Sequence, residues 1–289
     1  MRVALIHNRG AGGSLTPKKL HSVIEAAGHE LVRALEKVSD LDLAAEDEVD
    51  VVAVAGGDGT VRSAVRALAG KRVPIAILPL GTANNIAVGL GIEGSPRRLA
   101  RRWPEARRVP VDLGGVRGPW GQSRFIEGVG FGLVPESILA AKEVGKRRLA
   151  RSAGGAIRSA RRLYRRILSR LEPVPLSLTA DGEKLDGEYL LIQVLNIPSV
   201  GPNLRLAPDS SPSDGFLDLV TAGEKDRDAV RVLLDKRSRP EDVELPRRRV
   251  REVEIGDWRT IHVDDELQSS EAKSLASIAI EPAGVEFLV

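Results

Sequence analysis

The stretch Ala55-Gly56-Gly57-Asp58-Gly59-Thr60 follows directly on the apolar run at residues 51–54. A buried strand therefore enters a turn made almost entirely of glycine. Because glycine has no Cβ, it adopts positive φ and lets the backbone approach a ligand closely. Successive N–H groups in such a turn form a concavity that binds anions, and the helix expected at residues 61–69 adds its positive N-terminal end. The stretch predicts a phosphate site.

Asp58 places a carboxylate inside this phosphate site. A divalent cation or a hydroxyl donor lying between the carboxylate and the phosphates would account for it. The alternative is a tight glycine-rich turn from strand to helix that binds nothing. A lone Gly-Gly pair would favour that alternative, whereas the whole stretch at the end of a buried strand favours phosphate binding.

The composition limits the class of protein. The 289 residues allow one large domain or two ordinary ones. Hydrophobic residues make up 42% of the chain and aromatic residues only 3%, which predicts an aliphatic core. The chain has no cysteine, which excludes disulfides and cysteine-based zinc or redox chemistry. We see no signal peptide and no apolar run approaching the ~20 residues of a membrane span, so we expect a cytoplasmic protein.

The first hundred residues alternate between strand and helix patterns. Strands are expected at residues 3–7, 30–35, 50–55 and 73–78, and helices at 16–27, 61–69 and 83–90. This alternation is typical of a doubly wound α/β domain with a parallel sheet, in which ligands bind at the carboxyl ends of the strands. Three loops of unusual composition follow those ends, at residues 8–13, 56–60 and 79–85.

The pattern changes after residues 95–110, which mix proline and arginine and are expected to connect two domains. Short apolar runs separated by turn residues then predict an all-β sandwich, interrupted by a basic helical insertion at 135–171. We therefore expect a nucleotide-binding α/β domain at 1–108, to which a strand at 285–289 can return. A β-sandwich domain with the helical insertion is expected at 109–284.

The stretch Pro79-Leu80-Gly81-Thr82-Ala83-Asn84-Asn85 also follows a strand and opens a helix. Thr82 can cap that helix or bind a phosphate oxygen, and Asn84 can hydrogen-bond a phosphate or an adenine edge. Taken alone, the stretch fits a plain capping sequence equally well.

Several stretches together resemble the diacylglycerol kinase catalytic family, which includes sphingosine kinases and bacterial lipid kinases. They are Gly56-Gly57-Asp58-Gly59-Thr60, Pro79 to Asn84, Asn8-Arg9-Gly10-Ala11-Gly12-Gly13, Asn196 to Pro208, Asp214-Gly215-Phe216-Leu217-Asp218 and His262-Val263-Asp264-Asp265-Glu266. The match spans nearly the whole chain. The first two stretches are specific at the level of the superfamily, which also holds NAD kinases and phosphofructokinases. The C-terminal stretches narrow the resemblance to lipid kinases.

The resemblance implies roles for individual residues. Asp264 and Glu266 stand at the positions of the base and its support, and a Mg²⁺ ion is expected on ATP. Asp214 stands where the family binds a structural Mg²⁺, with backbone carbonyls near Ser211 and Phe216. The alternatives are a simple β-turn at Asp214 and a solvated acidic turn at Asp264. The residues implied in holding ATP are Asn8, Gly10, Gly12, Gly56, Gly57, Asp58, Gly59, Thr60, Thr82 and Asn84.

Departures from the family pattern bear on the acceptor and on activity. Asn85 stands where the family usually has Asp, Asp265 where it has Gly, and Gly132 where it often has Asp. They leave open a nucleotide-binding regulator that has lost catalysis. Because the glycine-rich motif is shared with other kinases, a kinase of a soluble polyol or nucleotide also remains open. We expect an ATP- and Mg²⁺-dependent kinase that phosphorylates the hydroxyl of diacylglycerol or a related lipid.

The segment 142–172 carries eleven Lys and Arg against two acids, a net charge of +9 in a chain of net charge +3. Three interpretations are open: a solvated helix pair whose arginine stems cover apolar surface, docking on an anionic membrane, or binding of nucleic acid. The scarcity of aromatic residues argues against stacking on bases. A lipid kinase must reach a substrate in a bilayer, so we expect a peripheral, salt-sensitive membrane contact and no nucleic-acid partner.

Overall fold

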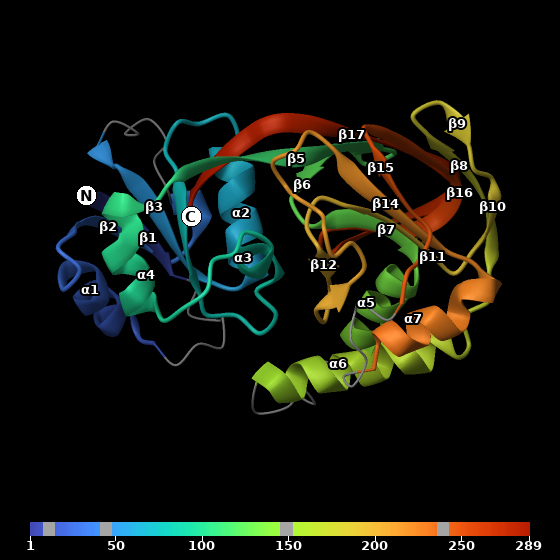
Figure 1. Cartoon of the computed structure of the whole chain (residues 1–289), viewed down its shortest axis with the longest axis horizontal. Coiled ribbons are helices and arrows are strands. Elements are labelled where there is room, and N and C mark those ends of the chain that lie inside the picture. The colour runs from blue at the N-terminus through green and yellow to red at the C-terminus, as the bar shows by residue number, and fades with distance from the viewer. Residues whose placement is uncertain (8–14, 41–47, 145–152, 236–242) are drawn as a thin grey trace. The chain divides into compact units, whose positions relative to one another are not determined.

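The computed structural model describes residues 1–7, 15–40, 48–144, 153–235 and 243–289 (Figure 1). Asn8, Gly10 and Gly12 therefore lie outside the described residues. The chain divides into two compact units, Met1–Asp112 with Pro282–Val289, and Leu113–Glu281. The expectation had placed the first unit at 1–108 with 285–289. In Figure 1 the C-terminus lies beside the blue strands of the first unit.

The first unit is built on a parallel sheet in the order β4-β3-β1-β2. The C-terminal end of the long strand β17 adds to this sheet, because Phe287 pairs with Ile75 in parallel. All six residues of β3 are buried, which matches their uninterrupted apolar sequence. The strands are β1 (Arg2–His7), β2 (Glu30–Leu35), β3 (Val51–Gly56), β4 (Ile75–Pro79) and β17 (Glu266–Leu288).

Helices α1 (Pro17–Glu25), α2 (Asp58–Leu68) and α3 (Asn85–Gly89) connect or follow these strands. A short 3₁₀ turn lies at Val38–Asp40. Thr16 caps α1 as expected, because its side chain accepts a hydrogen bond from the N–H of Lys19 at 3.4 Å. Helix α2 begins at Asp58, inside the glycine-rich motif, so the motif itself forms the first helical turn.

The expectation that residues 95–110 form a connection is wrong. They contain helix α4 (Pro96–Arg102) and a 3₁₀ turn at Trp103–Glu105. Leu99 and Trp103 are buried, and Trp103 stacks on His29 with ring centroids 5.2 Å apart. In the sequence, the many arginines of this segment made its apolar face hard to recognise. That face packs the helix against the first unit.

The second unit holds an antiparallel sheet in the order β15-β14-β11-β7-β16-β17. Strands β5, β6, β8, β9 and β10 pair outside this path, and β12 pairs with β13. The additional strands are β5 (Arg108–Gly118), β6 (Gly121–Phe125), β7 (Gly128–Gly132), β8 (Val174–Ala180), β9 (Glu183–Lys184), β10 (Gly187–Tyr189), β11 (Leu191–Leu195), β12 (Ser199–Val200), β13 (Leu204–Arg205), β14 (Leu217–Ala222), β15 (Arg247–Val250) and β16 (Glu252–Val263).

The two faces of this sheet belong to different apolar clusters. Along β11, Ile192 and Val194 join a cluster around Trp258 that is contributed mainly by strands. Leu191 and Leu195 point the other way, into a cluster that includes Tyr164 and Leu168 of a helix. The alternation follows from the two-residue period of a strand. One face is therefore the sandwich interior, and the other is covered by helices.

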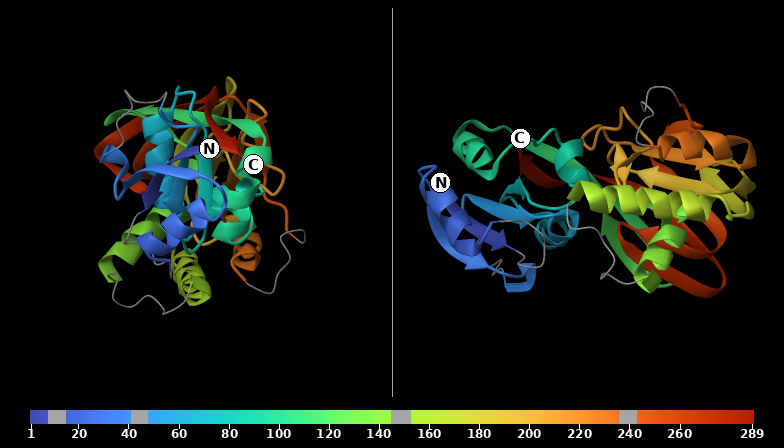
Figure 2. Two further views of the ribbon diagram at one scale, coloured as in Figure 1. Left: turned by 90° about the vertical axis from the view of Figure 1, so that its left-hand side faces the viewer. Right: turned by 90° about the horizontal axis from the view of Figure 1, so that it is seen from below.

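Those helices are α5 (Leu133–Val144), α6 (Ala153–Leu168) and α7 (Arg227–Leu233), the last preceded by a 3₁₀ turn at Glu224–Asp226. Helix α6 lies within the helical insertion expected at 135–171, and α5 begins two residues before it, whereas α7 was not expected. Figure 2 shows α6 as the long yellow-green helix, with α5 beside it.

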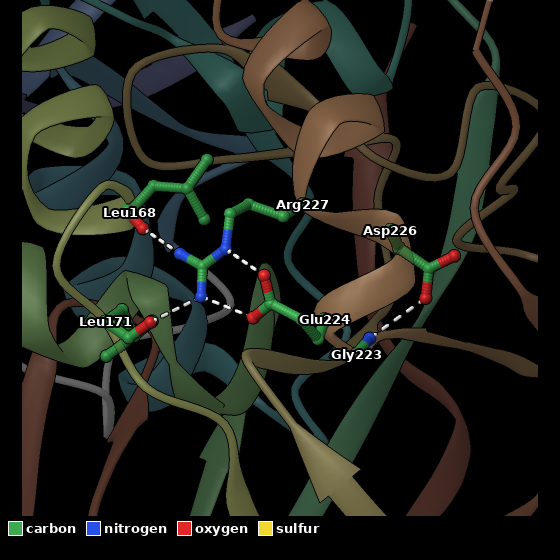
Figure 3. A network of polar contacts seen from close by, with 6 residues as sticks. All are labelled: Leu168, Leu171, Gly223, Glu224, Asp226 and Arg227. Carbon is green, nitrogen blue, oxygen red and sulfur yellow. Dashed lines mark hydrogen bonds and ion pairs between the residues drawn. The ribbon is translucent and has the colours of Figure 1, made fainter.

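Arg227 ties the C-terminal end of α6 to α7 (Figure 3). Its guanidinium donates to the carbonyl oxygens of Leu168 and Leu171, the latter at 2.7 Å, and pairs with both oxygens of Glu224 at 2.7 and 2.5 Å. The hydrogen bonds between the two side chains raise the pKa of Arg227 and lower the pKa of Glu224. A cation at a helix C-terminus also opposes the negative end of the helix dipole. Arg227 thus fixes where α6 ends.

Candidate functional site

Two turns at the carboxyl ends of neighbouring strands form the candidate nucleotide site. Gly56 closes β3 and pairs with Pro79, which closes β4. The N–H of Leu80 donates to the carbonyl oxygen of Gly56 at 2.9 Å. The two loops that the sequence singled out at 56–60 and 79–85 are therefore held side by side within the first unit.

The backbones of Gly57 and Gly81 approach each other closely. A Cβ on Gly81 would lie 2.4 Å from the Cα of Gly57, and a Cβ on Gly57 would lie 3.0 Å from the Cα of Gly81. Both distances are too short for a side chain to fit without movement of the backbone. The glycines are needed for packing the two turns together, as well as for admitting a ligand.

Asp58 has a structural role that the sequence analysis missed. Its Oδ1 accepts a hydrogen bond from the N–H of Ile86 at 3.0 Å, at the start of α3. The carboxylate of one motif thus caps the helix that follows the other motif. This hydrogen bond gives the carboxylate a structural role beside the candidate phosphate site.

Asn84 completes the second turn. It adopts a left-handed backbone with φ 51°, and its amide exchanges two hydrogen bonds with Gly81. Oδ1 accepts from the N–H of Gly81 at 2.9 Å, and Nδ2 donates to its carbonyl oxygen at 3.1 Å. Asn84 therefore shapes the turn, and its side-chain polar groups are engaged within the protein.

The first turn of α2 remains the best placed group for an anion. Its N-cap is Gly57, which has no side chain that could accept a hydrogen bond. The first N–H groups of a helix have no acceptor within the helix, so in α2 they are not capped by the N-cap side chain and can donate to an anion. Gly59 and Thr82 are exposed, whereas Thr60 is buried with its Oγ1 over Gly56. The expected phosphate ligands at 56–60, 82 and 84 therefore share one edge of the sheet.

Asp264 lies in the second unit, in the turn between β16 and β17. It is 4% exposed and adopts a left-handed backbone with φ 53°. Its Oδ1 accepts from the N–H of Glu127 at 2.9 Å and from that of Gly128 at 3.4 Å, while its own N–H donates to the carbonyl oxygen of Gly128 at 2.8 Å. The expected base is a buried, positioned carboxylate, unlike the solvated acidic turn that was the alternative.

The environment of Asp264 includes residues that sequence reasoning missed. His262 is fully buried, and its Nδ1 lies 2.7 Å from the carbonyl oxygen of Asp264. Glu127 and Gln193 are also buried. Their place next to Asp264 depends on strand pairing between distant segments, which no local pattern signals. Glu266 is exposed and opens β17 opposite Val263.

Two departures from the family pattern have structural explanations. In the hairpin turn the left-handed backbone is at Asp264, and Asp265 does not have a positive φ. An aspartate at position 265 therefore avoids the backbone strain that a positive φ would impose on a residue other than glycine. Gly132 has φ 80°, and a Cβ on it would lie 2.0 Å from the carbonyl oxygen of Leu190. No side chain fits at position 132 in this chain. Asn85, the third departure, is a buried residue of α3.

The turn at Asp214 does not fit a structural magnesium ion as it stands. Oδ1 of Asp214 accepts from the N–H of Phe216 at 3.0 Å, and Oδ2 pairs with Arg249 at 2.7 Å. The guanidiniums of Arg249 and Arg251 lie 4.4 and 4.8 Å from the centre of the Phe216 ring. Ser211 is exposed. Within the described residues, no group of three or more acidic or histidine side chains is arranged to hold a metal ion.

The fold and these two turns define a two-domain kinase architecture, and comparisons with known proteins agree. The family model of the diacylglycerol kinase catalytic domain matches residues 2–116, and the model of the YegS C-terminal NAD kinase beta sandwich-like domain matches residues 156–288. A diacylglycerol kinase of Bacillus subtilis strain 168 is 31% identical over 236 residues, which cover 76% of this chain and 73% of the relative.

Solved structures show the same fold. The crystal structure of a diacylglycerol kinase from Bacillus anthracis strain Sterne superposes with a TM-score of 0.70 at 19% identity, covering 99% of this chain and 96% of that one. An NAD kinase from Archaeoglobus fulgidus, crystallised in complex with ATP, gives a TM-score of 0.55 at 13% identity, covering 100% and 94%. The expected fold class, an α/β domain followed by a β-sandwich domain, is confirmed.

The chain belongs to the diacylglycerol kinase family. It is accordingly a phosphotransferase with an alcohol group as acceptor, and the suspected resemblance is confirmed. The relatives support lipid kinase activity in general terms.

Replacing Gly81 by alanine tests the contact between the two turns. The new Cβ would force the turns apart at a cost of about 1–3 kcal/mol, so we expect the Kd for ATP to rise about tenfold or more. Isothermal titration calorimetry measures it. The matched control is Gly154→Ala on α6, whose Cβ would meet only the end of the Arg158 side chain at 3.8 Å. Equal ATP affinity in both variants would contradict the role of the contact.

Thermal unfolding without nucleotide tests the turn at Asp214. In the wild type Arg249 already neutralises the carboxylate, so we expect Mg²⁺ to leave Tm unchanged. Arg249→Gln frees Oδ2, and Mg²⁺ should then raise Tm. The control is Arg248→Gln, which removes a neighbouring pair with Glu183 at 2.6 Å. A rise in the wild type as large as in Arg249→Gln would restore the magnesium site.

Proposed function

We propose that the chain transfers the γ-phosphate of ATP to the hydroxyl of diacylglycerol or a closely related lipid. The observation that carries this proposal is the buried carboxylate of Asp264, fixed by two backbone N–H groups. A carboxylate held in this way has the right chemistry for a general base. The family membership and the glycine turns of the first unit support the other part of the proposal, the binding of ATP.

On the nucleotide side, the first turn of α2 binds the phosphates of ATP. Gly57 leaves that turn without a side-chain cap, and Asp58 and Asn84 hold the neighbouring turn in shape. Gly56, Gly59, Thr60 and Thr82 complete the phosphate site. Bound Mg²⁺ supplies neutralisation of the phosphate charge. The residues Asn8, Gly10 and Gly12 keep their proposed place in the same site.

On the acceptor side, Asp264 takes the proton of the lipid hydroxyl as that oxygen attacks the γ-phosphorus. The other product is ADP, and Glu266, exposed two residues further on, supports the base. Phosphoryl transfer depends mostly on position and charge, so the fixed orientation of Asp264 matters more than its strength as a base. A soluble polyol would meet the same chemistry, and the acceptor assay below separates the two.

The arginines of α6 provide a way to reach a substrate in a membrane. Three exposed arginines of α6, at positions 158, 162 and 166, and Arg170 just beyond its end have no ion pair within the described part of the chain. Arg161, by contrast, is turned inward and donates to the carbonyl oxygens of Pro202 and Asn203 at 3.0 and 2.5 Å. Burial lowers its pKa. We therefore propose that α6 presents an arginine face to an anionic membrane.

No described helix is both long enough and apolar enough to cross a membrane. Contact through the arginine face would be peripheral and electrostatic, which makes it sensitive to salt. Four further basic residues of the segment 142–172, at positions 146, 147, 148 and 151, lie outside the described residues.

Transfer of labelled phosphate from ATP and Mg²⁺ to a total lipid extract tests the proposed reaction. We expect one labelled lipid that co-migrates with phosphatidic acid or a close relative. Asp264→Asn keeps an acceptor for the N–H of Glu127 but removes the base, so kcat should fall by about 10²- to 10⁴-fold. Asp228→Asn on α7 is the control, because this exposed carboxylate lies in neither motif.

Two results would contradict the proposal. Labelling of a soluble polyol or nucleotide in place of any lipid would move the acceptor to the soluble class. Binding of ATP with no transfer to any acceptor would favour the regulator that the departures at Asn85 and Asp265 left open.

Co-sedimentation with vesicles tests the arginine face. Binding to vesicles that contain phosphatidylglycerol should fall by about 100-fold when Arg158, Arg162 and Arg166 are all changed to Gln, since each basic residue contributes about 1 kcal/mol. The control changes Arg97, Arg101 and Arg102 of α4 to Gln, which removes the same charge from another exposed helix. An equal loss in both triple variants would show that net charge, and not α6, governs binding.

A further inference from the structure

His262, Gly130 and Gln193 lie in one row across three neighbouring strands of the second unit. In the register of the sheet, Gly130 of β7 pairs with His262 of β16 on one side and with Gln193 of β11 on the other. Because glycine has no side chain, the two outer side chains meet over it, with Nε2 of His262 2.9 Å from Oε1 of Gln193. A Cβ on Gly130 would lie 2.0 Å from Nε2 of Gln193. The glycine makes this contact possible.

The second ring nitrogen of His262 defines its protonation. Nδ1 lies 2.7 Å from the carbonyl oxygen of Asp264, and a carbonyl oxygen only accepts hydrogen bonds. Nδ1 therefore carries a proton and donates it. This conclusion does not depend on the state of Nε2.

The state of Nε2 is coupled to the Gln193 amide. As the side chain lies, Oε1 accepts from Nε2, and the imidazole is protonated on both nitrogens. Nε2 of Gln193 has no hydrogen-bond partner within the described residues. A half-turn of the amide would let that nitrogen donate to an unprotonated Nε2 of His262. In both arrangements Gln193 fixes the plane of the ring, and the ring donates through Nδ1 to Asp264.

The donation from His262 adds to the contacts that orient Asp264. The N–H of Asp264 donates to Gly128, its Oδ1 accepts from the N–H groups of Glu127 and Gly128, and its carbonyl oxygen accepts from His262. The backbone of Asp264 is left-handed, a conformation that L-residues adopt at a cost. The hydrogen bond from His262 to the carbonyl oxygen of Asp264 helps to hold this left-handed turn. It thereby keeps the carboxylate of Asp264 in one orientation.

We propose that His262 is a positioning residue for the base of the kinase reaction. Its Nδ1–H holds the carbonyl oxygen of Asp264, Gln193 holds the ring, and Gly130 provides the space between them. This inference rests on the proposed function, since it takes Asp264 to be the base. It predicts that losing the Nδ1 donor lowers kcat and leaves the KM for ATP unchanged, because the nucleotide turns belong to the first unit.

A pair of substitutions separates positioning from packing. Asparagine places its side-chain N–H near the position of Nδ1, whereas glutamine reaches toward the position of Nε2. His262→Asn should keep kcat within about threefold of the wild type, and His262→Gln should lower it about 100-fold, the size of effect expected from misplacing a catalytic group by about 1 Å. Thermal unfolding of both variants reports any general loss of packing.

Two further readouts do not require activity. Long-range ¹H–¹⁵N spectra of the wild type should show a protonated Nδ1 in the histidine signal that disappears in His262→Asn. The backbone N–H groups of Glu127 and Gly128 donate to the Asp264 carboxylate, so their hydrogen exchange should accelerate in His262→Gln and stay slow in His262→Asn.

Equal kcat in the two variants, or an unprotonated Nδ1, would overturn the inference. A wild type that phosphorylates no lipid would overturn the proposed function instead. In that case, slow exchange at Glu127 and Gly128 that depends on His262 would still establish His262 as the anchor of Asp264, and unchanged exchange would overturn that as well.

Discussion

The backbones of Gly57 and Gly81 are in contact, and the geometry of the first unit depends on that contact. A side chain on Gly81 would come within 2.4 Å of the Gly57 backbone. The turns after β3 and β4 can therefore lie this close only because both positions are glycine. The approach brings Asp58 within hydrogen-bonding distance of the start of α3 and keeps the start of α2 free of any side-chain cap. Parallel strands bring both turns to the same edge. The proposed phosphate site thus depends on close backbone packing.

In the second unit, the main constraint is the orientation of one buried carboxylate, that of Asp264. Three antiparallel strands place His262, Gly130 and Gln193 in one row, and the hairpin that follows β16 carries Asp264. Buried polar groups cost free energy unless they are hydrogen-bonded, so a network of this kind holds one geometry and resists others. Next to this sheet, α6 is anchored by its own Arg161 and by Arg227 of α7, while Arg158, Arg162 and Arg166 are exposed.

The sequence was sufficient for the parts of the structure that local pattern controls. The uninterrupted apolar run of β3, the proline after Thr16 and the glycine turn predicted a buried strand, a helix start and a turn from strand to helix. The amphipathic helix α4 was taken for a connection because its arginines masked Leu99 and Trp103. The burial of His262 could not be predicted, because it comes from β7 and β11, more than sixty residues away in the chain. Contacts set by strand register are not visible in a single sequence.

Hydrogen exchange measured by mass spectrometry, with and without ATP and Mg²⁺, tests the central claim most directly. In the proposed site, the phosphates lie at the first turn of α2 and against the turn that precedes α3. Backbone N–H groups in residues 57–61 and 80–86 should therefore exchange more slowly when ATP is bound, while those of α4 should not change. Binding of ATP without slower exchange in these two turns would contradict the account.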